Sequence, residues 1–364
     1  MSSSLAKYRM DLHQIPELGF EEFKTKDYLL DQIKQLTCDI HEVAKTGLLL
    51  FFDRGQTRTL AFRADMDALP IEEMTGQKFT STHPGLMHAC GHDGHMAILL
   101  GFAHYINQQK KLAHNVLLIF QPSEERDAGA HQIVASGLLE KYGVTAIYGL
   151  HLWPQLPKGK VFSKAHELMA QASEVTVTIQ GKSAHVASSN EGIDALQIAC
   201  RYLTDIYNAE AELPEHTYRL LKFGLFNSGT VRNILSEETK IEGTLRSYHP
   251  DIHSYLKSKM RTIANHYEQD YGCFIRLDYN DGYDAVINDA VLFFQAQQNI
   301  PYLQELVKPV LQAEDFGVYG QHYPILFSFL GIGQTSPLHN SKFDFDMSVL
   351  DHGLQYFIDL LHSS

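Results

Sequence analysis

The chain has few cysteines, a single tryptophan, no long apolar run and no excess of basic residues. Its four cysteines, among 364 residues, show no paired spacing, which argues against a disulfide framework. Since no run of about 18 apolar residues occurs, we expect no membrane partner. The formal net charge is −13, which excludes nucleic acid as a partner because phosphate backbones require a basic surface. The first residues lack a signal-peptide core, so a cytoplasmic location is expected.

The composition is that of an ordinary folded protein with more than one domain. Hydrophobic residues make up 44% of the chain and charged residues 20%. A length of 364 residues exceeds what one small core organises, so two domains are expected. Three cysteines, Cys38, Cys200 and Cys273, lie in apolar or amphipathic stretches, and we interpret them as small buried hydrophobes. Cys90 differs, because residues with metal-binding side chains flank it.

Short apolar runs alternate with amphipathic patterns over much of the chain. The pattern predicts strands at residues 48–52, 60–63, 116–120, 144–150 and 325–330, and helices at residues 21–36, 95–108, 130–142 and 347–361. Such alternation is typical of an α/β domain, with helices on both faces of a mixed, substantially parallel sheet. In open sheets of this kind, functional side chains gather beyond the carboxyl ends of the strands.

The middle of the chain follows a different pattern. Residues 174–180 alternate between apolar and polar side chains, as a half-buried strand does. Together with the segments that follow, they predict the order β-α-β-β-α-β of a ferredoxin-like unit. We therefore expect an inserted α+β domain at residues 173–284, within a larger domain formed by residues 1–172 and 285–364.

Residues 87–95 (MHACGHDGH) place a thiol, three imidazoles and a carboxylate within nine positions. Thiolate and imidazole groups both bind zinc-type ions, so Cys90 and His92 are candidate metal ligands. The alternative is a helix-entry loop with a half-buried thiol and surface histidines. His95 is expected to pack against or cap the following helix, and Asp93 is a candidate acceptor for an imidazole N–H.

Two acidic residues, Glu124 and Glu125, follow the predicted strand at residues 116–120. Adjacent carboxylates repel one another, and a metal ion would offset that repulsion, with one glutamate as ligand and the other as general base. The alternative is a solvated helix start, where acidic side chains favour the helix dipole.

Asp65 and Asp67 follow the predicted strand at residues 60–63. Either aspartate could orient an imidazole ligand, and the alternative is a turn with a salt bridge to Arg63. His151 and His339 also lie at candidate positions, although a single histidine is more often structural. The combination of these groups makes a divalent-metal hydrolase the leading hypothesis.

Five motifs then occur in the order found in one known family: residues 11–18 (DLHQIPEL), 63–70 (RADMDALP), 88–93 (HACGHD), 121–125 (QPSEE) and 314–316 (EDF). The chain resembles the two-metal aminoacylase and carboxypeptidase family, in its amidohydrolase branch, over nearly its whole length. That branch includes hippurate hydrolases, plant auxin-conjugate hydrolases and N-acetyldiaminopimelate deacetylases.

This resemblance implies a role for each motif residue. It implies two divalent metal ions (Zn, Mn, Co or Ni) and five ligands, namely Cys90, His92, Glu125, His151 and His339. Glu124 takes the position of the general base. Asp65 and Asp67 occupy the acidic motif that supports the metal site, although Asp65 stands where relatives elsewhere in the family carry a histidine ligand.

The inserted domain resembles the lid and dimerisation domain of the family, which implies a homodimer. There, His185 matches a histidine that reaches a neighbouring active site, and Asn233 and Arg246 match positions associated with substrate contact. Residues 186–189 (VASS) depart from the family pattern of small residues and a proline. The departure leaves open which acyl group or side chain is accepted.

Within the branch, the compact length and residues 11–25 resemble the bacterial N-acetyldiaminopimelate deacetylases most closely. This implies hydrolysis of N-acetyl-LL-diaminopimelate to LL-diaminopimelate and acetate in lysine biosynthesis. The alternative is a general N-acyl-amino-acid amidohydrolase of the aminoacylase or hippurate hydrolase type. A third hypothesis, a catalytically silent metal-dependent binding protein, is disfavoured because Glu124 is present.

Overall fold

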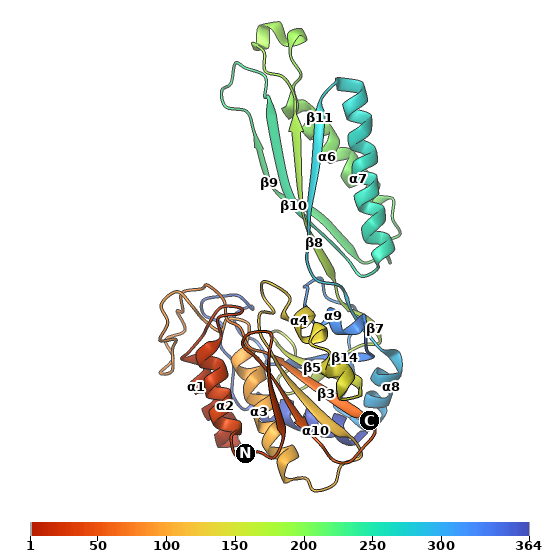
Figure 1. The fold of residues 1–364 in the computed structure, drawn as a ribbon. Coiled ribbons are helices and arrows are strands. Elements are labelled where there is room, and N and C mark those ends of the chain that lie inside the picture. The colour runs from red at the N-terminus through yellow and green to blue at the C-terminus, as the bar shows by residue number, and fades with distance from the viewer. Residues whose placement is uncertain (1, 364) are drawn as a thin grey trace. The chain divides into compact units, whose positions relative to one another are not determined.

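A computed structural model of the protein describes residues 2–363, and the chain divides into two compact units (Figure 1). Unit 1 comprises Met1–Leu168, Val286–Pro309 and Glu314–Ser364, and unit 2 comprises Met169–Ala285 and Val310–Ala313. Among the described residues, no helix has the length and apolar character needed to cross a membrane.

Unit 1 is built on an eight-stranded mixed sheet with the order β1-β2-β4-β3-β5-β14-β6-β13. Strand β3 runs parallel to both β4 and β5, and β5 runs parallel to β14, whereas β1, β2 and β4 pair in antiparallel fashion. The strands are β1 (Asp39–Val43), β2 (Gly47–Phe52), β3 (Thr59–Asp65), β4 (Asn115–Gln121), β5 (Val144–Trp153), β6 (Val161–Ser163), β13 (Leu303–Glu305) and β14 (Ile325–Gly331). A small second sheet pairs β7 (His166–Met169) with β12 (Val286–Asn288).

Helices cover both faces of the large sheet. Successive strand residues point to opposite faces, and the neighbours Leu117 and Leu118 of β4 are both fully buried. On one face, the Phe62 ring of β3 packs 4.7 Å from Phe102 and 5.3 Å from Phe357, between ring centroids. The helices of this unit are α1 (Ser2–His13), α2 (Phe23–Ile33), α3 (His92–Gln108), α4 (Gly129–Ala135), α5 (Leu138–Lys141), α8 (Ala290–Asn299), α9 (Gly317–Gly320) and α10 (Val349–Ser363).

Unit 2 has the order β-α-β-β-α-β along the chain, and its antiparallel sheet has the strand order β11-β8-β10-β9. Its elements are β8 (Gln171–Gln180), the 3-10 helix η1 (Val186–Glu191), α6 (Ala195–Ala211), β9 (Arg219–Ser228), β10 (Glu238–Ser247), α7 (Pro250–Tyr271) and β11 (Phe274–Asp281). The alternate residues Val175, Val177 and Ile179 of β8 are buried in a core with both helices. The predicted fold class, an α/β domain with helices on both faces of a mixed sheet and an inserted ferredoxin-like α+β unit, is confirmed.

Three local expectations were wrong. Helix α3 begins at His92 rather than His95, because Gly91 adopts a left-handed conformation (φ 89°) that starts the helix earlier. The helix expected at residues 130–142 is interrupted at Gly137, which has a φ of 70°. Cys200 is exposed on α6, whereas Cys273 is buried and Cys38 is half-buried.

The topology brings the carboxyl ends of β3, β4 and β5 to one edge of the sheet, because these strands are parallel neighbours. Asp65 is the last residue of β3, Glu124 lies shortly after the end of β4, and His151 lies near the end of β5. Helix α3 packs against all three strands and begins with His92. Residues far apart in sequence are therefore placed at one edge.

Candidate functional site

Five predicted metal ligands come together at this edge of unit 1. The donor atoms of Cys90, His92 and Glu125 all lie within 4.8 Å of one another. The Cys90 Sγ atom is 3.5 Å from His151 Nε2, and the Glu125 Oε1 atom is 3.1 Å from His339 Nε2. The site thus collects one sulfur, three imidazole nitrogens and one carboxylate from four separate segments.

Backbone carbonyl groups orient two of the imidazoles. His92 Nδ1 donates to the carbonyl of Asp67 at 2.8 Å, and His151 Nδ1 donates to the carbonyl of Leu152 at 2.7 Å. Since a carbonyl oxygen only accepts, Nδ1 carries the proton in each ring. The lone pair of each Nε2 atom is then available toward the cluster, which is the arrangement that a metal-binding histidine requires.

His339 reaches the cluster from a loop that follows β14. Its backbone has a positive φ of 62°, and its N–H donates to the carbonyl of Ala89 at 2.8 Å. The side chain is 51% exposed, whereas that of Glu125 is 11% exposed. The hydrogen bond to Ala89 fixes this loop directly beside Cys90, although the two segments are far apart in sequence.

The electrostatics of the cluster fit a bound cation. Within residues 2–363, His92 Nε2 is a buried atom without a hydrogen-bond partner. Burial lowers the pKa of His92, but the negative charges of Asp65, Asp67 and Glu125 outweigh burial and raise this pKa to about 10. The cluster therefore favours positive charge, and its sulfur, nitrogen and oxygen donors suit a divalent ion of the zinc type.

Glu124 lies beside this donor set and is 5% exposed. Asp67 holds the surrounding loop, because its carboxylate accepts the N–H groups of Glu124 at 3.0 Å and of Glu125 at 2.9 Å. Burial, followed by the negative charge of Glu314, raises the pKa of Glu124 well above its usual range. A carboxyl group with a raised pKa is suited to accept a proton and to deliver it in a later step.

Asp65 forms the expected contact with Arg63, and it also orients an imidazole, although that imidazole is not one of the five predicted ligands. Its Oδ1 atom lies 2.6 Å from His95 Nδ1, and its Oδ2 atom accepts from Arg63 Nη1 at 2.7 Å. The other nitrogen of His95 accepts the N–H of Leu152 at 2.9 Å. Both nitrogens of His95 are therefore engaged within the protein, so we exclude His95 from the ligand set although it lies close to His92.

A buried charge network behind the site was not foreseen from the sequence. Arg63 Nη2 donates to Asp315 Oδ1 at 2.7 Å and to Glu314 Oε1 at 3.0 Å, and Gln121 Nε2 donates to Asp315 Oδ2 at 2.6 Å. Arg63 is 2% exposed. An arginine within an otherwise apolar strand was the available signal, since a buried guanidinium requires carboxylate partners.

Asp93 accepts from an imidazole, as expected, but the imidazole is that of His13 rather than a candidate ligand. The His13 Nδ1 atom lies 2.8 Å from Asp93 Oδ2, and Arg9 Nε donates to the same oxygen at 3.2 Å. All three side chains are buried. This network joins α1 to the start of α3, and therefore supports the segment that carries His92.

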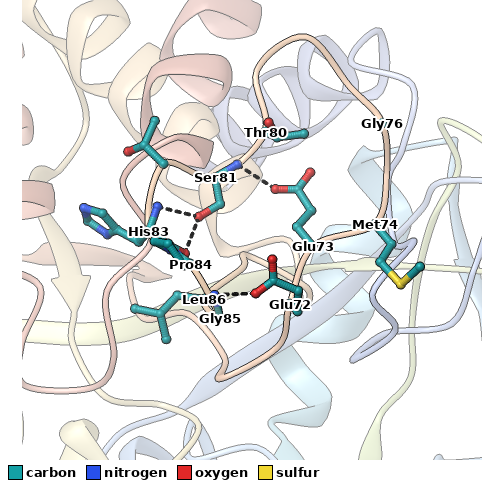
Figure 2. A pocket seen from close by; sticks show the side chains of 11 residues that line it. Glu72, Glu73, Met74, Gly76, Thr80, Ser81, His83, Pro84, Gly85 and Leu86 are labelled. Atoms are coloured by element: carbon teal, nitrogen blue, oxygen red, sulfur yellow. Dashed lines mark hydrogen bonds between the residues drawn. The ribbon is translucent and has the colours of Figure 1, made fainter.

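A surface pocket of about 500 Å³ lies on the loop between β3 and α3 (Figure 2). Two of its lining carboxylates close the loop on itself. Glu72 accepts the N–H of Gly85 at 2.7 Å, and Glu73 accepts the N–H of Ser81 at 2.6 Å. We interpret this pocket as part of the loop scaffold, because its acidic groups bind the backbone.

In unit 2, the predicted substrate-contacting residues form two separate groups. His185 and Asn233 are exposed neighbours, joined by a hydrogen bond from the Val186 N–H to the Asn233 carbonyl at 3.2 Å. Arg246 lies near the carboxyl end of β10, about 26 Å along the strand from its first residue, Glu238, at the usual rise per residue. There its Nη1 atom donates to the carbonyl of Leu311 at 2.8 Å.

Comparisons with known proteins agree with this geometry. The model of peptidase family M20/M25/M40 matches residues 61–363. The N-acetyldiaminopimelate deacetylase of Oceanobacillus iheyensis is 34% identical over 100% of both chains. That of Priestia megaterium is 35% identical over 93% of this chain and 92% of its own. A solved dinuclear metal-binding peptidase of the M20 family from Bacillus subtilis is 30% identical, with a TM-score of 0.87 over 99% of this chain and 97% of that one. The resemblance found in the sequence is confirmed.

Proposed function

Because the chain belongs to peptidase family M20/M25/M40, we propose that this metal-dependent amide hydrolase removes the acetyl group of N-acetyl-LL-diaminopimelate. The products are LL-diaminopimelate and acetate, on a cytoplasmic route to lysine. The names of the full-length relatives at 34% and 35% identity support this substrate. The observation that carries the reaction type is the buried carboxyl of Glu124 beside a convergent set of sulfur, nitrogen and oxygen donors.

The proposed ligands are the five clustered side chains, Cys90, His92, Glu125, His151 and His339. Two divalent ions, when bound, supply the Lewis acidity that lowers the pKa of the attacking water and polarises the acyl carbonyl. Asp67 positions the backbone of the two glutamates, and Asp65 fixes His95 beside the cluster.

Glu124 carries the proton in the proposed mechanism. Its carboxylate accepts a proton from water as the water oxygen attacks the acetyl carbon. When the carbon–nitrogen bond breaks, the same carboxyl delivers this proton to the departing amine, so that acetate and a free amine are released. The raised pKa of Glu124 supports both steps, because a basic carboxylate accepts the proton readily and retains it until the amine leaves.

We assign substrate contacts and a lid role to unit 2. Arg246 binds a substrate carboxylate, since a guanidinium group matches that shape with two hydrogen bonds. His185 and Asn233 are assigned to the active site of a partner subunit in a homodimer. Asn233 precedes the first residue of β10, and Arg246 lies about 26 Å along that strand. This separation supports the division, because one compact substrate does not bridge it.

A substrate panel tests the proposed function. Turnover of N-acetyl-LL-diaminopimelate is expected to exceed that of simple N-acetyl amino acids and of hippurate, with acetate or benzoate release as the readout. Faster turnover of hippurate or of N-acetyl amino acids would favour the general amidohydrolase. The Glu124→Gln variant is expected to bind two metal ions per chain and to lose at least about 100-fold in kcat, the usual contribution of a general base. Near-normal turnover by this metal-loaded variant would contradict the assignment of Glu124 as the general base.

Mixing two inactive variants tests the dimer. Glu124→Gln and His185→Ala are each expected to be inactive alone. After exchange of subunits, half of the dimers are hybrids, and each hybrid has one site with an intact Glu124 and an intact partner histidine. Activity should therefore recover to about a quarter of the wild-type value. No recovery, in a mixture shown to contain hybrids, would contradict a shared site.

A further inference from the structure

The loop that carries Glu124 is strained at the preceding residue. Ser123 has a positive φ of 53°, a conformation that residues other than glycine adopt at a cost. The approach of Gly19 from the N-terminal segment is also close: a Cβ atom at Gly19 would lie 2.4 Å from Ser123 Oγ. A backbone held in this way requires interactions that keep it from relaxing, and its relaxation would displace the next side chain.

Buried carboxylates hold three consecutive backbone N–H groups of this loop. Asp67 accepts those of Glu124 and Glu125. The third N–H, that of Ser123 itself, donates to Glu22 Oε1 at 2.9 Å. Glu22 comes from the turn before α2, more than 100 positions away in sequence. The N-terminal segment thus contributes a direct contact to the loop of the general base.

Burying the carboxyl group of Glu22 costs desolvation free energy, and few hydrogen bonds offset that cost. It is fully buried, and burial raises the pKa of its carboxyl to about 7. Its second oxygen, Oε2, accepts from Thr46 Oγ1 at 2.6 Å, in the buried turn between β1 and β2. Both hydrogen bonds of the carboxylate therefore go to the protein scaffold. A hydrophobic residue would fill the same space without the desolvation cost, but it would leave the Ser123 N–H unsatisfied.

We propose that Glu22 is a positioning residue that holds the strained Ser123 backbone and thereby aims the carboxyl of Glu124 at the reacting water. The inference rests on the proposed role of Glu124. Glu22 touches no candidate ligand and acts through the chain alone. Loss of its hydrogen bond would let Ser123 relax toward a negative φ, which moves Glu124 while leaving the ligand atoms in place. A misplacement of about 1 Å can lower turnover by about 100-fold.

Variants of the metal-loaded enzyme, assayed with N-acetyl-LL-diaminopimelate, test the proposal. Glu22→Ala is expected to lower kcat by about 10- to 100-fold, with KM within about twofold of wild type and two metal ions per chain. Glu22→Gln is expected to stay within about threefold in kcat, because its amide oxygen still accepts the Ser123 N–H. Thr46→Val is the matched control, since it removes the other hydrogen bond of the same carboxylate and should leave kcat within about threefold.

A comparison of two conservative variants covers the case in which Glu22→Ala does not fold. Glu22→Gln keeps the reach of the side chain and loses its charge, whereas Glu22→Asp keeps the charge and loses the reach. Positioning predicts a higher kcat for Glu22→Gln than for Glu22→Asp. An equal or reversed order would overturn the proposal, as would a folded Glu22→Ala variant whose kcat equals that of Thr46→Val.

A further variant tests the strain directly. Glycine adopts positive φ without penalty, so Ser123→Gly should restore part of the kcat that Glu22→Ala loses. No restoration in the double variant, with its melting temperature unchanged from Glu22→Ala, would contradict a role through the Ser123 backbone. The Glu124→Gln variant separates the two hypotheses. If it is active, the proposed function fails; if it is inactive and Glu22→Ala is fully active, only the positioning role fails.

Discussion

Replacing Arg63 by methionine should lower the stability of unit 1 substantially. The guanidinium group is almost fully buried and contacts Asp65, Glu314 and Asp315 at 2.7–3.0 Å. Removing one partner from such a network leaves a buried charge uncompensated, which typically costs about 3–5 kcal/mol. We therefore expect the free energy of unfolding to fall by about that amount, with methionine filling most of the vacated volume.

Urea unfolding followed by tryptophan fluorescence measures this loss. Trp153 is the single tryptophan, and it lies at the end of β5 in unit 1, so the signal reports on the unit that contains Arg63. Arg58→Met is the matched control, because Arg58 is exposed and its loss should change stability by less than about 0.5 kcal/mol. A loss below about 1 kcal/mol for Arg63→Met would refute the reasoning.

The pH dependence gives an independent check on the same variant. Burial favours the protonated form of Asp65, but His92, His95 and Arg63 outweigh burial and hold its pKa well below the usual range. A lowered pKa stabilises the folded state above the unfolded pKa of about 4, and this contribution disappears as the pH falls. Without Arg63, the carboxyl takes up a proton more readily. The deficit of Arg63→Met should therefore be largest above about pH 5 and should shrink as the pH falls through about 4; a constant deficit would exclude this explanation.

Three further outcomes follow from the geometry. Asp93 outweighs the effect of burial and raises the pKa of His13 to about 9, so the stability this pair contributes is complete below pH 6.5 and is lost as the pH rises through 9. The unfolding free energies of wild type and His13→Gln should therefore differ by up to about 3 kcal/mol at pH 6 and converge near pH 10, whereas a constant difference would contradict the shift. Gly94→Ala should destabilise by about 1–3 kcal/mol in thermal unfolding, because the new Cβ would lie 2.7 Å from Leu152 Cδ1 and 2.8 Å from Phe345 Cζ; an unchanged melting temperature would exclude this clash. Chelation should abolish activity and lower the melting temperature, with recovery on adding zinc or manganese, and full activity after verified removal of metal would exclude metal dependence.

The sequence predicted the architecture because its signals are local. The alternating pattern at residues 174–180 and the buried runs at 116–120 and 144–150 each indicate a strand without reference to the rest of the chain. Element ends were less predictable. The start of α3 depended on the left-handed Gly91, and the break at Gly137 depended on a conformation that the helical pattern does not encode.

The candidate site likewise contains residues that the sequence indicates and contacts that it does not. The sequence indicates Cys90 and His92 as candidate ligands because several metal-binding side chains lie within a few positions there. The contacts of Arg63 with Asp315 and of Glu22 with Ser123 join residues separated by 252 and 101 positions. The sequence around Glu22 gives no sign of Ser123, since an isolated glutamate is compatible with a solvated surface. Arg63 within an apolar strand indicates carboxylate partners but does not identify them. Such pairs become visible only when the fold places them together.

These long-range pairs explain how one glutamate among several neighbouring acids acquires a raised pKa. The carboxyl groups of Asp67 and Glu22 accept backbone N–H groups, so their positions are fixed. Glu314 accepts from Arg63 at 3.0 Å and from the N–H of Phe316 at 3.1 Å. Burial, followed by the negative charges of Glu314, Glu125, Asp315 and Asp67, raises the pKa of Glu124 well above its usual range. Asp67 therefore has two effects on Glu124: it accepts the N–H group of that residue and it contributes to raising the pKa of its carboxyl.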